Sequence, residues 1–172
     1  MTATTDAVLG LGGNVGKRQV ALGAAIAALR GHRAIQIIAA SPLYESEPWG
    51  VTGQQDFLNA ALRVATSLGP ADLLTAILAI EVSLGRVRGK KWAPRVIDID
   101  ILVYGEEAID IPGLTIPHPH LCERAFALAP LLDVMPAAVI GNRPARQWLA
   151  QLDRKGLNRI AGPEWANPKS NI

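Results

Sequence analysis

The sequence of 172 residues contains a single cysteine, Cys122. One cysteine cannot form an internal disulfide, and it cannot build a cysteine-rich zinc framework. The chain also lacks an apolar run of the roughly 18 residues that cross a bilayer, and its first residues, MTATTDAVLG, lack the basic start of a signal peptide. We therefore expect a cytoplasmic protein without disulfides and without a membrane partner.

No internal repeat and no low-complexity linker divides the chain. Hydrophobic residues make up 49% and charged residues 19%, which is ordinary for a packed globule. The length lies within the usual single-domain range, so we expect residues 1–172 to form one domain, with residues 162–172 as a loose tail. A net charge of +2 is too small to indicate nucleic-acid binding by itself.

Hydrophobic periodicity and turn residues predict the order of the elements. Strands are expected over residues 7–11, 35–40, 57–66 and 96–104, and helices over residues 17–30 and from Pro70 to Gly85. The order β-α-β-β-α-β implies an α+β fold with an antiparallel-rich sheet, both helices on one face and the other face partly open. Residues 41–55 form a long connection, and short strands and two helices, near 124–132 and 143–152, are expected after Gly105.

Two aspartates on the last of these strands are the first candidates for chemistry. Ile97, Ile99 and Ile101 alternate with Asp98 and Asp100, so both carboxylates point to the same face. Alternate residues stand roughly 6.5 to 7 Å apart on a strand, which lets two carboxylates hold one or two hard cations such as Mg²⁺. The alternative is that the pair is only the solvated face of an edge strand.

A basic segment, GRVRGKKWAPR, comes immediately before these aspartates. It carries several cations, no acid and flexible glycines, so it could close over a polyphosphate beside the metal site. The alternative is a solvated surface loop or a nucleic-acid patch, in which Trp92 would stack on a base.

The segment PHPHLCER brings together His118, His120 and Cys122, and these residues allow a zinc site to be imagined. A second possibility is that His118 contacts a phosphate oxygen, with Arg124 and Arg95 supplying fixed positive charge. The residues alone do not rank these possibilities.

Two further patterns are less specific. Phe57 and Asn59 face the open side of the sheet, where a ring could stack on a flat heterocycle and an amide could recognise its polar edge. The early GLGGNVGK resembles a phosphate-binding loop, but its spacing fits neither common glycine-rich motif. We interpret it as a tight strand-to-helix turn.

Four blocks, SPLYESEPWG, QQDFLNAAL, GRVRGKKWAPRVIDIDILVYG and LTIPHPHLCERAFALAPLLDV, together resemble the 6-hydroxymethyl-7,8-dihydropterin pyrophosphokinase family of folate biosynthesis, from about residue 8 to about residue 136. The resemblance implies a ferredoxin-like α+β fold with C-terminal additions. It also implies a reaction in which the pterin's hydroxymethyl oxygen attacks the β-phosphorus of ATP, giving the pterin diphosphate and AMP. The implied partners are ATP and the pterin, without nucleic acid, and the implied state is a monomer.

The same resemblance assigns roles to individual residues. It implies two Mg²⁺ ions on Asp98 and Asp100, with Asp100 also assisting removal of the hydroxyl proton. The catalytic residues implied are Arg86, Arg95, Asp98 and Asp100. The pterin-binding residues implied are Ser46, Phe57, Asn59, Arg124 and Phe126. The ATP-binding residues implied are Leu74, Glu81, Arg86, Arg88, Trp92, Arg95, Ile101, Thr115 and His118.

Two rival classes of protein remain to be weighed. A ferredoxin-like nucleic-acid-binding module should carry exposed aromatics on its central strands, and Asp98 and Asp100 on the open face argue against it. A nucleotide-sugar transferase could use the same aspartates, but the chain is short for that class and its element order differs.

Overall fold

The computed structural model describes residues 3–48, 50, 52–87, 89 and 93–167. Its centre is a six-stranded sheet in the order β10-β3-β4-β1-β5, with β2 also paired to β4, and all pairs are antiparallel. The strands are β1 (Thr5–Gly13), β2 (Ile35–Ala40), β3 (Leu43–Ser46), β4 (Phe57–Thr66), β5 (Asp98–Tyr104) and β10 (Asn158–Ala161).

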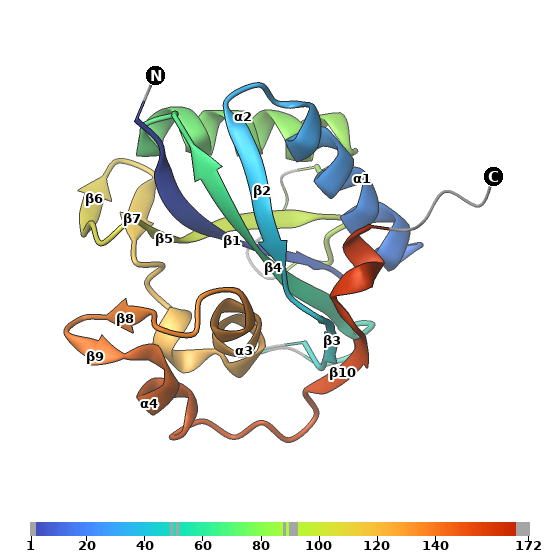
Figure 1. The fold of residues 1–172 in the computed structure, drawn as a ribbon. Coiled ribbons are helices and arrows are strands. Elements are labelled where there is room, and N and C mark those ends of the chain that lie inside the picture. Colours follow the sequence, from blue (N-terminus) through green and yellow to red (C-terminus); the bar gives the residue numbers. More distant parts are fainter. Residues whose placement is uncertain (1–2, 49, 51, 88, 90–92, 168–172) are drawn as a thin grey trace.

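Two helices, α1 (Arg18–Gly31) and α2 (Pro70–Ser83), pack on one face of this sheet (Figure 1). Their apolar sides meet the side chains that alternate along the strands, including Leu58, Leu62 and Ile99, in one buried cluster. Pro70 starts α2 because its fixed φ suits the first helical turn. The strand order β2-β4-β1-β5 with both helices on one face is the predicted ferredoxin-like arrangement.

The other face of the sheet is covered over only part of its area. Helix α3 (Ala125–Val134) packs there against β4, and Val8, Ala61 and Leu102 join its buried side in a second cluster. A short hairpin of β8 (Val139–Ile140) and β9 (Arg143–Pro144) and helix α4 (Ala145–Leu149) extend this layer, below the sheet in Figure 1. The uncovered part of this face holds the candidate site.

After β5 the chain forms a small hairpin of β6 (Ile109–Ile111) and β7 (Leu114–Ile116), followed by a 3-10 turn over Leu121–Glu123. The main-chain N–H of His118 donates to the carbonyl of Leu102 at 3.0 Å, which ties this segment to β5. Every helix in the described part of the chain is too short or too polar to cross a membrane.

The predicted connection over residues 41–55 contains a strand that the sequence did not reveal. Strand β3 pairs with the first residues of β4, whereas β2 pairs with the rest of β4. The Ser41 hydroxyl oxygen accepts the main-chain N–H of Ala61 at 2.9 Å, at the point where the chain passes from one pairing to the other. A four-residue strand with a proline close to each end has too short a hydrophobic pattern to be predicted.

The prediction of a loose tail is wrong for Pro163–Ala166, which forms a 3-10 turn. Trp165 is buried there, and its indole N–H donates to the carbonyl of Ser41 at 2.8 Å. Figure 1 shows this turn beside α1, and Arg30 of that helix donates to Asn167. A tryptophan that finds both an apolar cavity and an acceptor anchors a segment whose composition suggests disorder.

Candidate functional site

A pocket opens on the partly covered face of the sheet, between β1, β4, β5 and the start of α3. It encloses about 880 Å³ of space, counting the solvent at its mouth. All of the predicted pterin-binding residues line it: Ser46, Phe57, Asn59, Arg124 and Phe126.

The polar floor of this pocket is Asn59 on β4. Its side-chain amide donates to the Ser46 hydroxyl at 2.8 Å, and both residues are buried. Gly12 of β1 pairs with Asn59 on one side and with Asp98 on the other. A Cβ atom at Gly12 would stand 3.4 Å from the Asn59 Oδ1 atom and 3.8 Å from the Phe57 ring, which are ordinary contact distances, so Gly12 lies directly beside this floor.

The interpretation of GLGGNVGK as a tight turn is therefore only partly right. Gly10, Gly12 and Gly13 belong to β1, and the turn that leads into α1 covers residues 14–17. Only Gly16, with φ of +64°, supplies the left-handed backbone in that turn. Two of the four glycines, Gly10 and Gly12, line the pocket.

A second pocket lies against β5, α2 and the β6–β7 hairpin. Four of the predicted ATP-binding residues line it: Leu74, Ile101, Thr115 and His118. Asp100 and His118 line both pockets. The two pockets therefore meet at these two side chains.

Asp98 is enclosed by positive charge. Its Oδ1 atom accepts from Arg86 at 2.5 Å, and its Oδ2 atom accepts from Arg95. Arg86 also pairs with Glu81 of α2, which is only 2% exposed and accepts the main-chain N–H of Ile99 at 2.7 Å. Glu81 thus holds Arg86 from behind the strand, so that its guanidinium reaches the carboxylate on the site face.

The charge states of Asp100 and His118 follow from their surroundings. Burial, with the nearby carboxylate of Asp98, raises the pKa of Asp100 to about 7. Burial, with the nearby Arg124 cation, lowers the pKa of His118 to about 4, so its imidazole is neutral at pH 7. The His118 Nε2 atom lies 4.0 Å from the Asp100 Oδ2 atom.

We predict that Asp100→Asn stabilises the metal-free protein, and more at pH 8 than at pH 5. A folded-state pKa above the ordinary value means that the native protein holds the proton, so stability is lost as pH rises from about 4 through about 7. The Asp100 side chain is 43% exposed, so solvent screening reduces the effect, and we expect a gain of about 2 °C at pH 8. Thermal unfolding with a chelator at both pH values measures it; a pH-independent difference would contradict the assignment.

We predict that Arg86→Met costs about 2 kcal/mol, because it leaves the buried Glu81 carboxylate without its cation. Burial already raises the pKa of Glu81, and losing Arg86 raises it further, so the loss of stability should grow as pH rises. Urea unfolding of Arg86→Met, Glu81→Gln and the double variant tests this. The double variant should be more stable than Arg86→Met alone, and additive losses would exclude the coupling.

The remaining predicted residues differ in placement. Arg95 lines the first pocket, whereas Arg86 and Glu81 line neither pocket. Arg86 pairs directly with Asp98, and Glu81 pairs with Arg86. Arg88 and Trp92 lie outside the described residues.

The structure does not support the zinc site considered for His118, His120 and Cys122. Among the described residues, no group of three histidine, cysteine, aspartate or glutamate side chains is placed to hold a metal ion. The His120 ring nitrogen instead lies 3.1 Å from Glu123.

Some lining residues were not predicted. Glu47 and Gln54 line the first pocket, and Asp110 lines the second. The first two lie in the long connection between β3 and β4, where length was the only signal in the sequence. Asp110 carries no motif.

The arrangement has close relatives among known proteins. The family model for 7,8-dihydro-6-hydroxymethylpterin-pyrophosphokinase matches residues 8–136, the range predicted for the resemblance, which includes the four sequence blocks. The 2-amino-4-hydroxy-6-hydroxymethyldihydropteridine pyrophosphokinase of Methylorubrum extorquens is 44% identical over 91% of this chain and 99% of its own length. The protein of the same name from Pseudomonas aeruginosa is 39% identical over 88% of this chain and 94% of its own.

Solved structures agree at the level of the fold. The wild-type HPPK-DHPS of Plasmodium falciparum, solved with pteroate, aligns with a TM-score of 0.75 at 18% identity. The alignment covers 93% of this chain and 48% of that one, so this chain spans about half of that protein. With the family model, the bacterial relatives and the fold in agreement, the chain belongs to the 7,8-dihydro-6-hydroxymethylpterin-pyrophosphokinase family, and it is an enzyme of the pyrophosphokinase class.

Proposed function

We propose that this protein transfers diphosphate from ATP to the hydroxymethyl group of 6-hydroxymethyl-7,8-dihydropterin, a step of folate biosynthesis. The hydroxymethyl oxygen forms a bond to the β-phosphorus, and the bond between that phosphorus and the oxygen of the α-phosphate breaks. AMP leaves with the electron pair, and the hydroxyl proton passes to a base or to water. The observation that carries this proposal is the pair of pockets that meet at Asp100 and His118.

The first pocket fits the pterin. Phe57 and Phe126 offer aromatic surface, while the buried Asn59 amide offers a donor and an acceptor to the polar edge of the ring. The Ser46 hydroxyl fixes the orientation of that amide. Arg124, whose guanidinium carbon lies 5.8 Å from the centre of the Phe126 ring, places a cation at the end of this pocket.

The second pocket fits ATP. Leu74 and Ile101 provide apolar surface for the base, and Thr115 provides a hydroxyl near the rim. The neutral His118 imidazole can donate one hydrogen bond to a phosphate oxygen where the two pockets meet. The phosphate chain would then extend toward Asp100 and the first pocket.

Asp98 and Asp100 suit two magnesium ions. Both are oxygen donors on the same face of β5, and phosphate oxygens and water would complete the coordination of each ion. Bound Mg²⁺ would neutralise charge on the transferring group. Since both oxygens of Asp98 accept from arginines, Arg86 or Arg95 must release this carboxylate for an ion to bind.

The released arginines can then turn to the phosphates. Arg95 already lines the first pocket, and a guanidinium binds phosphate oxygens in the same way as carboxylate oxygens. We propose that Arg88 and Trp92 complete the nucleotide side of the site from the same basic segment. Asp100, whose carboxylate lies where the two pockets meet, is the proposed acceptor of the hydroxyl proton.

The position of the label in the products tests the reaction. We expect protein mixed with Mg²⁺, the pterin and ATP labelled in the β-phosphate to transfer the label to the pterin, and ATP labelled in the α-phosphate to yield labelled AMP. ADP as the nucleotide product would show transfer of one phosphoryl group and would overturn the proposal. A folded protein that makes neither product would overturn it as well.

Because both pockets are built within one chain, we propose that a single-domain monomer performs the reaction.

A further inference from the structure

Asn14 stands at the end of β1, is 2% exposed and lines neither pocket. Its Oδ1 atom accepts the main-chain N–H of Arg95 at 2.9 Å. Its Nδ2 atom donates to the Gln54 Oε1 atom at 3.0 Å and to the Gln55 carbonyl at 3.0 Å. Its own main-chain N–H donates to the Arg95 carbonyl at 2.9 Å.

One buried amide therefore joins two segments that are far apart in the sequence. On one side its oxygen holds the main-chain N–H of Arg95, at the end of the basic segment, and the main-chain N–H of Asn14 holds the Arg95 carbonyl. On the other side the amide nitrogen holds Gln54 and Gln55, which lead into the proposed pterin-binding strand β4. Both amide protons and the amide oxygen are used, so removing the side chain removes three part-buried hydrogen bonds at once.

The neighbouring glycine shows how closely these parts fit. A Cβ atom at Gly13 would stand 2.4 Å from the carbonyl oxygen of Val96, which is main chain and cannot move aside as a flexible side chain would. Glycine at this position lets residues 95–96 lie directly on β1. That contact brings Arg95 within reach of Asn14.

The groups that Asn14 holds both face the first pocket. Arg95 pairs with Asp98 and lines this pocket, and Gln54 lines it from the opposite segment. We propose that Asn14 is a positioning residue that sets Arg95 and residues 52–56 in one arrangement, so that the phosphate-binding arginine and the pterin pocket are formed together. This inference rests on the proposed function for the names of the two ligands.

A second tether provides a comparison. Arg18, the first residue of α1, donates to the Asp56 carbonyl at 2.7 Å and pairs with Glu45 at 2.8 Å. It holds the same connection, but none of these bonds reaches Arg95. Arg18→Ala should therefore loosen only the pterin side, whereas Asn14→Ala should loosen both sides.

Steady-state kinetics of matched variants test the proposal. For Asn14→Ala we expect kcat to fall about 10- to 100-fold and the KM for the pterin to rise several-fold, because misplacing a charged group by about 1 Å costs on this scale. Asn14→Asp keeps the acceptor for the Arg95 N–H and loses both donors, so it should raise the pterin KM with a smaller loss of kcat. Arg18→Ala should raise the pterin KM and keep kcat within about 2-fold.

Ser41→Ala is the control for lost stability, because it also removes a buried side-chain hydrogen bond to the main chain but lies away from both pockets. We expect it to lower Tm without changing kcat or KM of the folded protein. If Asn14→Ala behaves like Ser41→Ala, with a lower Tm and unchanged kcat and KM, the proposal is wrong.

Amide hydrogen exchange gives a measurement that does not depend on the reaction. Asn14→Ala should speed exchange in residues 52–56 and in residues 95–97, and Arg18→Ala only in the first segment. Faster exchange in one segment alone for Asn14→Ala would overturn the coupling. Failure of the wild-type protein to make AMP would instead overturn the proposed function. The exchange measurement would still decide whether Asn14 couples the two segments.

Discussion

Replacing Asp98 by alanine should lower turnover about 1,000-fold or more. The variant loses a carboxylate that is proposed to hold Mg²⁺, and with it the ion that would neutralise charge on the transferring phosphates. The fold should survive the change. Arg86 keeps its partner Glu81, and the Arg95 side chain is 28% exposed and can be hydrated, so we expect a loss of stability within about 1 kcal/mol. AMP release measured over a range of Mg²⁺ concentrations, with Tm measured in parallel, separates the two effects.

Asp153→Asn is the control for this experiment. Asp153 accepts the main-chain N–H of Lys155 at 2.8 Å in an exposed turn, away from both pockets, and its loss should leave turnover unchanged. Full activity in Asp98→Ala would exclude a metal-binding role for the pair. A Tm decrease of more than about 10 °C would show that Asp98 has a structural role as well.

Replacing Asn59 by leucine should lower kcat/KM for the pterin by about 100- to 10,000-fold, since a site built to hydrogen-bond its ligand rejects it when those bonds are lost. Leucine has the same branching and number of side-chain heavy atoms as asparagine, so the floor of the pocket is filled but its donor and acceptor are gone. The KM for ATP should change little, because Asn59 does not line the second pocket. Initial rates with each substrate varied in turn measure both quantities.

Ser46→Ala separates recognition from orientation. It removes the hydroxyl that accepts from the Asn59 amide at 2.8 Å but leaves the amide in place, so its effect should be smaller, about 10-fold. An Asn59→Leu variant that loses affinity for ATP and pterin equally would instead indicate general disruption of the sheet, and the assignment of the first pocket to the pterin would not stand.

The parts of the fold that the sequence predicted are those with local patterns. Strands β2 and β4 begin and end at the predicted residues, because alternation over several residues identifies both a strand and its buried face. The same alternation placed Asp98 and Asp100 on one face. The predicted helix near residues 143–152 ends at Leu149, so element ends were less certain than element types.

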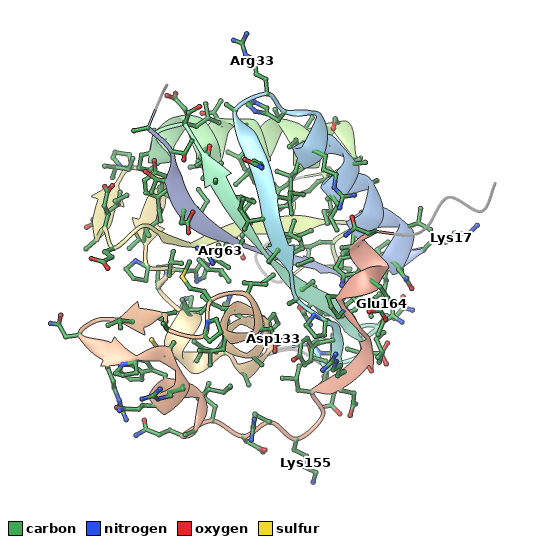
Figure 2. All side chains as sticks on the ribbon, in the orientation of Figure 1. Lys17, Arg33, Arg63, Asp133, Lys155 and Glu164 are labelled. Atoms are coloured by element: carbon green, nitrogen blue, oxygen red, sulfur yellow. The ribbon has the colours of Figure 1, made fainter. Side chains whose placement is uncertain are left out.

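The parts that were missed depend on distant partners. Strand β3 exists because it pairs with the start of β4, and Trp165 is buried because Ser41 offers it a carbonyl 124 residues away along the chain. On α3, Asp133, which is labelled in Figure 2, accepts from the Tyr44 hydroxyl at 2.6 Å and joins this helix to β3. No local pattern reports such pairs.

The candidate site divides in the same way. The family resemblance named five residues as pterin-binding, and the structure brings them together in the first pocket. It did not reveal that Arg86 and Arg95 both pair with Asp98, nor that Asn14 joins two distant segments. Those relations follow from packing between elements rather than from the identity of any one residue.

The side chains that the two pockets share affect which substitutions could make the protein resistant to an inhibitor. Ala60 and Ala127 line the first pocket but not the second. A larger side chain at either position could block a compound that contacts it without changing the proposed binding of ATP in the second pocket. Asp100 and His118 line both pockets, so in the proposed reaction we expect a substitution at either position to change the use of both substrates. We expect resistance to arise slowly against compounds whose affinity depends on these two side chains.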